Sequence, residues 1–140
     1  MAMENTETPT ALILSRQNIA QLPDGNDYAE AEKGAYIVAG SDENPDVILV
    51  ASGSEVSTLV AGAELLRADG LKVRIVSAPS EGLFRSQPKE YQDELLPNGA
   101  KIFGLTAGLP VNLQGLVGCN GKVLYSCERY MADSMAGACE

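Results

Sequence analysis

Residues 45–79, PDVILVASGSEVSTLVAGAELLRADGLKVRIVSAP, predict a strand, a helix and a second strand joined by tight turns. The apolar run at 47–51 has no polar alternation and is rich in β-branched residues, which is typical of a strand buried on both faces of a parallel sheet. Two strands joined by a helical crossover of this length are expected to be parallel. The stretch therefore predicts an α/β architecture.

The helix within this stretch has clear expected ends. Ser52 and Glu55 stand at capping-box spacing, which predicts that the helix begins just after Gly53. Gly70 can adopt the left-handed conformation that ends a helix. Between these ends, apolar residues recur at helical spacing and form one stripe that can pack on a sheet: Val56, Leu59, Val60, Ala63 and Leu66.

Short apolar runs elsewhere in the chain extend this pattern. The further strand candidates are residues 10–14, 35–39, 101–105 and 122–125, and the further helix candidates are a short turn after Ser80, residues 88–95 and residues 111–117. We therefore predict a three-layer α/β/α sandwich with a mainly parallel sheet of about five strands. Because 10–14 and 35–39 precede the crossovers, one of them is expected to be an antiparallel edge strand.

Length and composition favour one domain over residues 1–140, with residues 1–8 as a linker or the end of an upstream segment. The formal net charge of −9 disfavours nucleic acid and anionic membranes as partners, since both need clustered cations. No apolar run approaches the roughly 20 residues that span a bilayer. Three cysteines without CxxC spacing or a secretory signal indicate a reduced, cytosolic setting.

The chain contains no histidine, which removes the usual general base, metal ligand and triad partner together. We predict no catalytic residue and no metal site within it. The Gly53-Ser54 turn could favour an anion at a helix N-terminus, but Glu55 opposes a phosphate there, and we interpret the turn as structural.

A polar segment, Ser15-Arg16-Gln17-Asn18, follows the first strand candidate. The planar guanidinium of Arg16 can hold a phosphate or carboxylate with two hydrogen bonds. It can instead pair with a nearby acid such as Asp24 or Asp27. The residues alone favour this pairing and leave the phosphate site as the alternative.

Several motifs make the chain resemble the C-terminal domain of transketolase, a thiamine-diphosphate-dependent enzyme. They are PTALILSRQNIAQL at 9–22, KGAYIV at 33–38, the crossover segment at 45–80 and LFRSQPKEYQDELLP at 83–97. Residues 106–134 depart from the family pattern, and the chain has no tryptophan. The resemblance also implies upstream domains and a last helix beyond the 140 residues, as in a fragment of a longer enzyme.

The resemblance implies a function and partners. Transketolases transfer a two-carbon ketol unit between sugar phosphates, as cytoplasmic enzymes of the pentose phosphate pathway that are expected to be homodimers. Thiamine diphosphate and a divalent metal such as Mg²⁺ would bind in the upstream domains, with no cofactor in this chain. Arg16 would bind the phosphate of the sugar substrate, with Ser15 and Gln17 orienting its loop. The domain would pack against the upstream domains and be inactive alone.

Two alternatives remain at this point. The chain could belong to a related thiamine-diphosphate enzyme, such as a deoxyxylulose-phosphate synthase or the β subunit of a 2-oxo-acid dehydrogenase. It could instead be a free-standing, non-catalytic α/β module for binding or dimerisation. The order of SRQN followed by KGAY favours transketolase.

Overall fold

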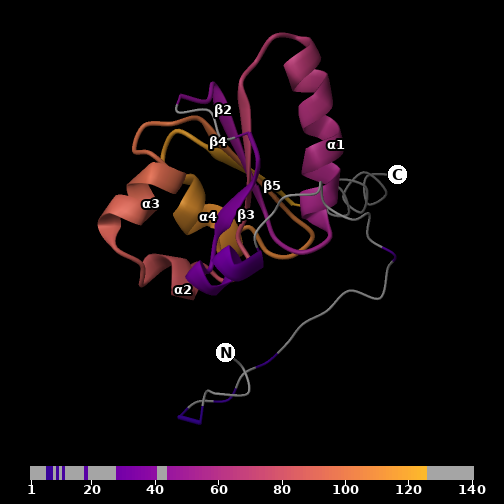
Figure 1. The fold of residues 1–140 in the computed structure, drawn as a ribbon. Helices are drawn as coiled ribbons and strands as arrows, with labels where there is room; N and C mark the ends of the chain where they lie inside the picture. Colours follow the sequence, from indigo (N-terminus) through magenta and orange to yellow (C-terminus); the bar gives the residue numbers. More distant parts are fainter. Residues whose placement is uncertain are drawn as a thin grey trace, which may run out of the picture.

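The computed structural model describes residues 6, 7, 9, 11, 18, 28–40 and 44–125 (Figure 1). The elements within these residues are, in chain order, the 3₁₀ helix η1 (Tyr28–Lys33), β1 (Tyr36–Ala39), β2 (Val47–Ala51), α1 (Glu55–Ala68), β3 (Val73–Ser77), α2 (Glu81–Arg85), α3 (Lys89–Leu95), β4 (Ile102–Thr106), α4 (Val111–Val117) and β5 (Lys122–Tyr125).

The strands of the described part form one mixed sheet in the order β1-β3-β2-β4-β5. Strands β2, β3, β4 and β5 run parallel, whereas β1 pairs with β3 in the antiparallel direction. The predicted fold class is therefore confirmed, and β1 is the antiparallel edge. The other strand candidate, residues 10–14, lies outside the described residues except for Ala11.

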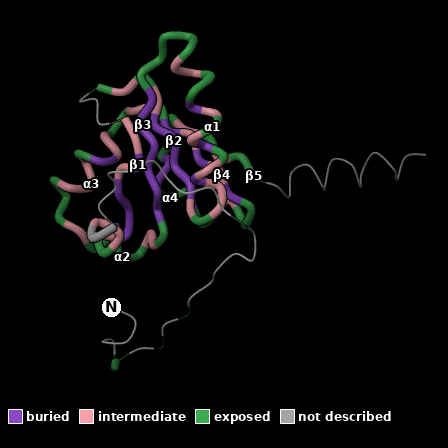
Figure 2. The backbone as a smooth tube through the Cα atoms, turned by 45° about the vertical axis from the view of Figure 1, so that its right-hand side comes forward, coloured by how far each residue is buried: buried purple, intermediate pink, exposed green. Residues whose placement is uncertain are grey.

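Helices cover both faces of the sheet (Figures 1 and 2). On one face α1 packs against β2 and β3 through a core that includes Leu49, Leu59 and Ile75. On the other face α2, α3 and α4 enclose a second core that includes Val50 and Phe84. Strands β2 and β3 are buried between the two layers, which explains why β2 is a continuous apolar run, VILVA.

The sequence predicted the end of α1 correctly but not the details of its start. The helix stops as predicted: Gly70 has φ of 86°, and the Leu71 amide donates to the Leu66 carbonyl over 3.1 Å. The predicted start is wrong in detail. The N-cap is Ser54, whose hydroxyl donates to Glu55 Oε1 over 2.9 Å, so the expected pair of Ser52 with Glu55 is replaced by a contact between neighbours.

One charged side chain is buried within the sheet layers. Arg74 of β3 is 5% exposed, and its Nη1 donates to the carbonyls of Glu94 and Leu95 over 2.9 and 3.2 Å. These carbonyls lie at the C-terminal end of α3, where the helix itself supplies no donors. Arg74 therefore ties the end of α3 to the sheet and compensates part of the cost of burying its charge.

Candidate functional site

The phosphate-binding segment predicted from the sequence lies outside the described residues. This applies to Arg16 and to its supporting residues Ser15 and Gln17. The structure does show at which edge of the sheet the N-terminal part of the chain joins the described fold. A site that includes Arg16 would lie near that edge.

All four parallel strands end at one edge of the sheet, called the carboxyl edge below. The chain leaves β2 over the face covered by α1 and leaves β3 over the opposite face, through α2 and α3. Since β3 and β4 lie on opposite sides of β2, the strand order reverses there. In open α/β sheets, ligands bind in the crevice outside the carboxyl ends of the strands at such a switch point. The turns after β2 and β4 border it here.

Because β1 is antiparallel, its first residue also lies at the carboxyl edge. Tyr36 is paired with Ser77, the last residue of β3, and the Ser80 amide donates to the Gly34 carbonyl over 3.0 Å. A Cβ at Gly34 would lie 2.4 Å from the Phe84 amide nitrogen, and Gly34 has φ of 87°. Only glycine fits this conformation and this close approach. Helix η1 therefore enters the fold beside α2, at the carboxyl edge (Figure 1).

Side-chain contacts from α3 hold this entry point in place. The Tyr91 hydroxyl donates to the Ala35 carbonyl over 2.8 Å, and the Lys33 ammonium lies 4.7 Å from the centre of the Tyr91 ring. Lys33 also bonds to Glu30 over 3.0 Å, and this hydrogen bond raises the pKa of Lys33. Burial raises the pKa of the Tyr91 phenol, so it remains a protonated donor at neutral pH.

The turn after β2 is poorly suited to hold a phosphate. Gly53 has φ of 64°, and nothing lies within 4 Å of the position of its Cβ. The backbone of this turn is therefore open enough for a ligand to approach it. The Glu55 carboxylate, however, occupies the first turn of α1 and accepts from the Ser54 hydroxyl. A carboxylate at a helix N-terminus satisfies the positive end of the helix dipole and repels another anion. The interpretation of this turn as structural stays the better one.

The turn after β4 combines a fixed start with an apolar exposed end. The Thr106 hydroxyl is buried and accepts from the Gly108 amide over 3.0 Å, which closes the turn directly behind the strand. Beyond it, Leu109 and Val111 are 63% and 62% exposed. The sequence did not single out these residues, because an apolar loop residue has no pattern that distinguishes exposure from burial. Together they present an apolar rim at the carboxyl edge.

The described residues contain neither a cluster of potential metal ligands nor a membrane-spanning helix. Within them, no group of three or more His, Cys, Asp or Glu side chains could hold a metal ion. No helix of the described part is long and apolar enough to cross a membrane.

A family model for the transketolase-like TK C-terminal domain matches residues 34–130. Among curated proteins, this chain is 40% identical over 126 residues to Transketolase 2 of Vibrio parahaemolyticus and 40% identical over 127 residues to Transketolase of Staphylococcus aureus. Each match covers 89% of this chain but only 19% of the relative. The chain thus spans about a fifth of the length of these relatives, and Arg16 lies ahead of the region that the family model matches.

Solved structures give the same result. A transketolase from Pichia stipitis in complex with sedoheptulose-7-phosphate has a TM-score of 0.61 and 36% identity, covering 67% of this chain and 14% of that one. Transketolase from Leishmania mexicana has a TM-score of 0.62 and 33% identity, covering 68% and 14%. The described elements therefore correspond to a small part of much longer enzymes.

Proposed function

Because this chain belongs to the transketolase C-terminal domain family, we propose that it forms the C-terminal part of a transketolase that transfers a two-carbon ketol unit between sugar phosphates. The motifs around SRQN, KGAY and GSEV predicted this family, and the matches to curated transketolases confirm it. The proposal gives the chain two tasks, which are to help bind the substrate phosphate and to pack against the rest of the enzyme.

The observation that carries the phosphate-binding task is the direction of β1. Its antiparallel pairing with β3 brings the N-terminal side of the described chain to the carboxyl edge, the same edge as the switch point at β2, from which β3 separates it. Arg16 lies twelve residues before the first residue of η1 in the sequence. We assign to Arg16 the binding of the sugar phosphate, with Ser15 and Gln17 orienting its loop. Support comes from the solved relative that binds sedoheptulose-7-phosphate.

The chemistry of ketol transfer must come from other parts of the enzyme. Thiamine diphosphate supplies the carbanion stabilisation that such transfer requires, and we propose that it binds with a divalent metal such as Mg²⁺ in upstream domains. The described residues contain no metal-binding cluster. We derive no chemical step from this chain, and expect it to be inactive alone.

For the packing task, this chain would pack against upstream domains of the same enzyme. The whole enzyme would form a homodimer in the cytoplasm. The apolar rim of Leu109 and Val111 supports this part of the proposal, because it lies at the same edge as the entry of the chain. Exposed apolar groups gathered at one edge are common at interfaces with other domains. The remaining length of the relatives, about four fifths, is ample for such domains.

The proposal is tested in a chimera in which this chain replaces the matching region of Transketolase 2 of Vibrio parahaemolyticus. We expect the chimera to transfer ketol units between phosphorylated sugars. Arg16→Ala should raise KM for phosphorylated substrates by about ten- to a hundredfold, the equivalent of about 1.5–3 kcal/mol for a hydrogen bond to a charged group. The isolated chain with added thiamine diphosphate and Mg²⁺ should show no transfer.

Lys101→Ala provides the matched control, since it removes an exposed cation just before β4. It should leave KM unchanged. Substrates without a phosphate should be insensitive to Arg16→Ala, because they lack the group that the guanidinium binds. An equal rise in KM for both kinds of substrate would mean that Arg16 has a structural role. Turnover by the isolated chain would overturn the proposal that the chemistry comes from upstream domains.

A further inference from the structure

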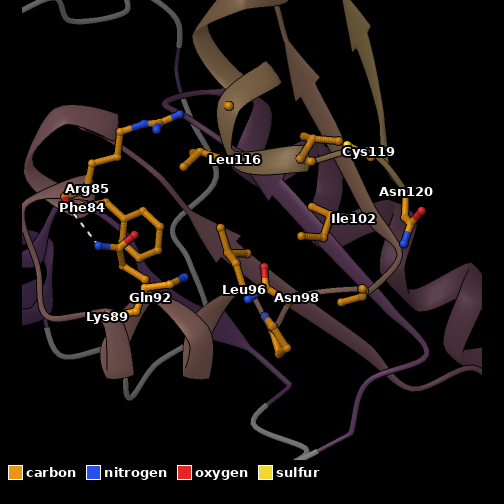
Figure 3. A pocket seen from close by; sticks show the side chains of 16 residues that line it. Phe84, Arg85, Lys89, Gln92, Leu96, Asn98, Ile102, Leu116, Cys119 and Asn120 are labelled. Atoms are coloured by element: carbon orange, nitrogen blue, oxygen red, sulfur yellow. Dashed lines mark hydrogen bonds between the residues drawn. The ribbon is translucent and has the colours of Figure 1, made fainter.

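A cavity of about 390 Å³ lies on the face of the sheet that α2, α3 and α4 cover, away from the carboxyl edge (Figure 3). It is bounded by these three helices, by the start of β4 and by two turns, residues 96–100 before β4 and residues 118–120 before β5. Both turns lie at the end of the sheet where the parallel strands begin. Its volume is within the range of small-molecule pockets in proteins.

The inner wall of the cavity is apolar. Ile102 at the start of β4 and Leu116 of α4 are 6% and 7% exposed, and Leu96 lies beside them in the turn after α3. Figure 3 shows these three side chains directed toward the same space. Beside this wall, Gln92 donates from Nε2 to the carbonyls of Arg85 and Gln87 over 3.0 and 2.8 Å, which ties α3 to the end of α2. This surface suits an apolar body about the size of an aromatic ring.

The rim of the cavity carries two cations, each of which is paired with an acid. Among the sixteen residues that line it, Arg85 and Lys89 are cationic, and none is Asp or Glu. This is unusual for a chain with a net charge of −9. The two cations contact Glu81 and Asp93 outside the lining, over 2.7 and 2.5 Å. Both are exposed pairs one helical turn apart, and such pairs are weak enough to admit another anion.

The position of the guanidinium depends on a glycine of α4. A Cβ at Gly115 would lie 1.9 Å from Arg85 Nη2 and 2.5 Å from Glu81 Oε1. The charged end of Arg85 therefore lies against bare helix backbone at the edge of the cavity. Its contact with Glu81 uses Nε, Nη2 and one carboxylate oxygen. Within the described part of the chain, Nη1 makes no hydrogen bond and keeps its capacity to donate to another acceptor.

From this geometry we propose that the cavity is a second ligand site, which binds a phosphate monoester with an apolar body. The phosphate lies at the rim that carries Arg85 and Lys89, and the apolar body lies against Leu96, Ile102 and Leu116. A phosphate monoester carries a charge of about −1.5 to −2 near pH 7, which matches two cations better than the single charge of a carboxylate. The site is independent of Arg16 and of the proposed enzymatic function.

The test is an amide NMR titration of the 140-residue chain with phenyl phosphate. We expect saturable shifts at Gly99, Gly115 and Gly118, and binding about tenfold or more tighter than that of inorganic phosphate, benzoate or benzyl alcohol. Absence of saturable binding would overturn the proposal. Equal binding of inorganic phosphate would indicate an adventitious ion only, and equal binding of benzoate would overturn the assignment to phosphate.

Variants locate the binding site. Arg85→Gln and Lys89→Gln should each weaken phenyl phosphate binding about tenfold or more, whereas Lys72→Gln, which removes an exposed lysine before β3, should not weaken it. Gly115→Ala keeps every charge but displaces the guanidinium, and should also weaken binding. All four positions are exposed, so thermal unfolding should confirm that the variants fold. If Lys72→Gln weakened phenyl phosphate binding equally, binding would depend only on the net charge of the chain, and the proposed site would be overturned.

Discussion

The two edges of the sheet are built differently, although each is a four-residue strand. The antiparallel edge, β1, alternates buried and half-buried residues, whereas the parallel edge, β5, alternates exposed and half-buried ones. Val38 of β1 is 5% exposed and Leu124 of β5 is 44% exposed. Position at the edge of a sheet therefore does not by itself decide how tightly a strand is held.

The difference lies in the backbone contacts at the ends of the strands. Strand β1 lies between Gly34 and Gly40, which both have positive φ and both approach other backbone closely. Within the described residues, strand β5 has one such contact, at its start, where a Cβ at Gly121 would lie 2.3 Å from the Ile102 carbonyl oxygen. Strand β5 is also short and carries exposed Lys122, features that discourage further strand pairing. We expect substitutions at β1 to cost more stability than those at β5.

The largest expected effect is at the end of β1. Gly40→Ala forces a side chain into φ of 75° and sets a Cβ 2.1 Å from the Val73 carbonyl oxygen, which belongs to backbone and cannot swing away. Strain of this kind, together with overpacking, should lower the free energy of unfolding by about 2–4 kcal/mol. Urea unfolding followed by circular dichroism measures the loss.

Gly53→Ala is the matched control for that experiment. Gly53 also has positive φ, at 64°, but nothing lies within 4 Å of the position of its Cβ. It should therefore show only the conformational cost, about 1–2 kcal/mol. If both variants lose the same stability, the close contact between Gly40 and Val73 contributes nothing, and the contrast between the edges weakens.

A smaller effect is expected at the start of β1, where the Tyr91 hydroxyl donates to the Ala35 carbonyl. Tyr91→Phe removes this hydrogen bond and should cost about 0.5–1.5 kcal/mol. Burial raises the pKa of Tyr91 above its ordinary value of 10.0, so the folded state keeps the proton longer than the unfolded state does. Stability should therefore fall as the pH rises from about 10 through the raised pKa.

Urea titrations at pH 8 and above pH 10 measure this dependence. The wild-type chain should lose more stability across the interval than Tyr91→Phe, which has no phenol to titrate. Lys33 titrates in the same direction, since its pKa is also raised, but it is present in both proteins. Parallel losses in the two proteins would show that Tyr91 is not coupled to folding.

The features predicted from sequence are those set by neighbours along the chain. Consecutive apolar residues in β2 and the glycine at position 70 specify a strand and a helix end locally, and both predictions were correct. The start of α1 was wrong because two serines, Ser52 and Ser54, compete within one turn and the backbone decides between them. The direction of β1 could not be chosen from its sequence, because an edge strand has the same pattern in either orientation.

Features that depend on distant segments could not be predicted. The role of Arg74 requires knowing that the end of α3 lies over β3. The cavity beside Arg85 needs helices, two turns and a strand from separate parts of the chain, together with a bare backbone at Gly115. The candidate site was predicted from a resemblance rather than from periodicity. Its central residue, Arg16, stays a prediction.

The smallest effect is expected on the β5 edge. Leu124 lies on the same face of the sheet as α1, paired with half-buried Leu105 of β4, and remains 44% exposed. Leu124→Gln should change the free energy of unfolding by no more than about 0.5 kcal/mol, as for other exposed positions. Val38→Thr, which places a hydroxyl in the buried part of β1, should cost about 1–3 kcal/mol. Both are measured by urea unfolding, and a loss at Leu124 as large as that at Val38 would show that the β5 edge is held as firmly as β1.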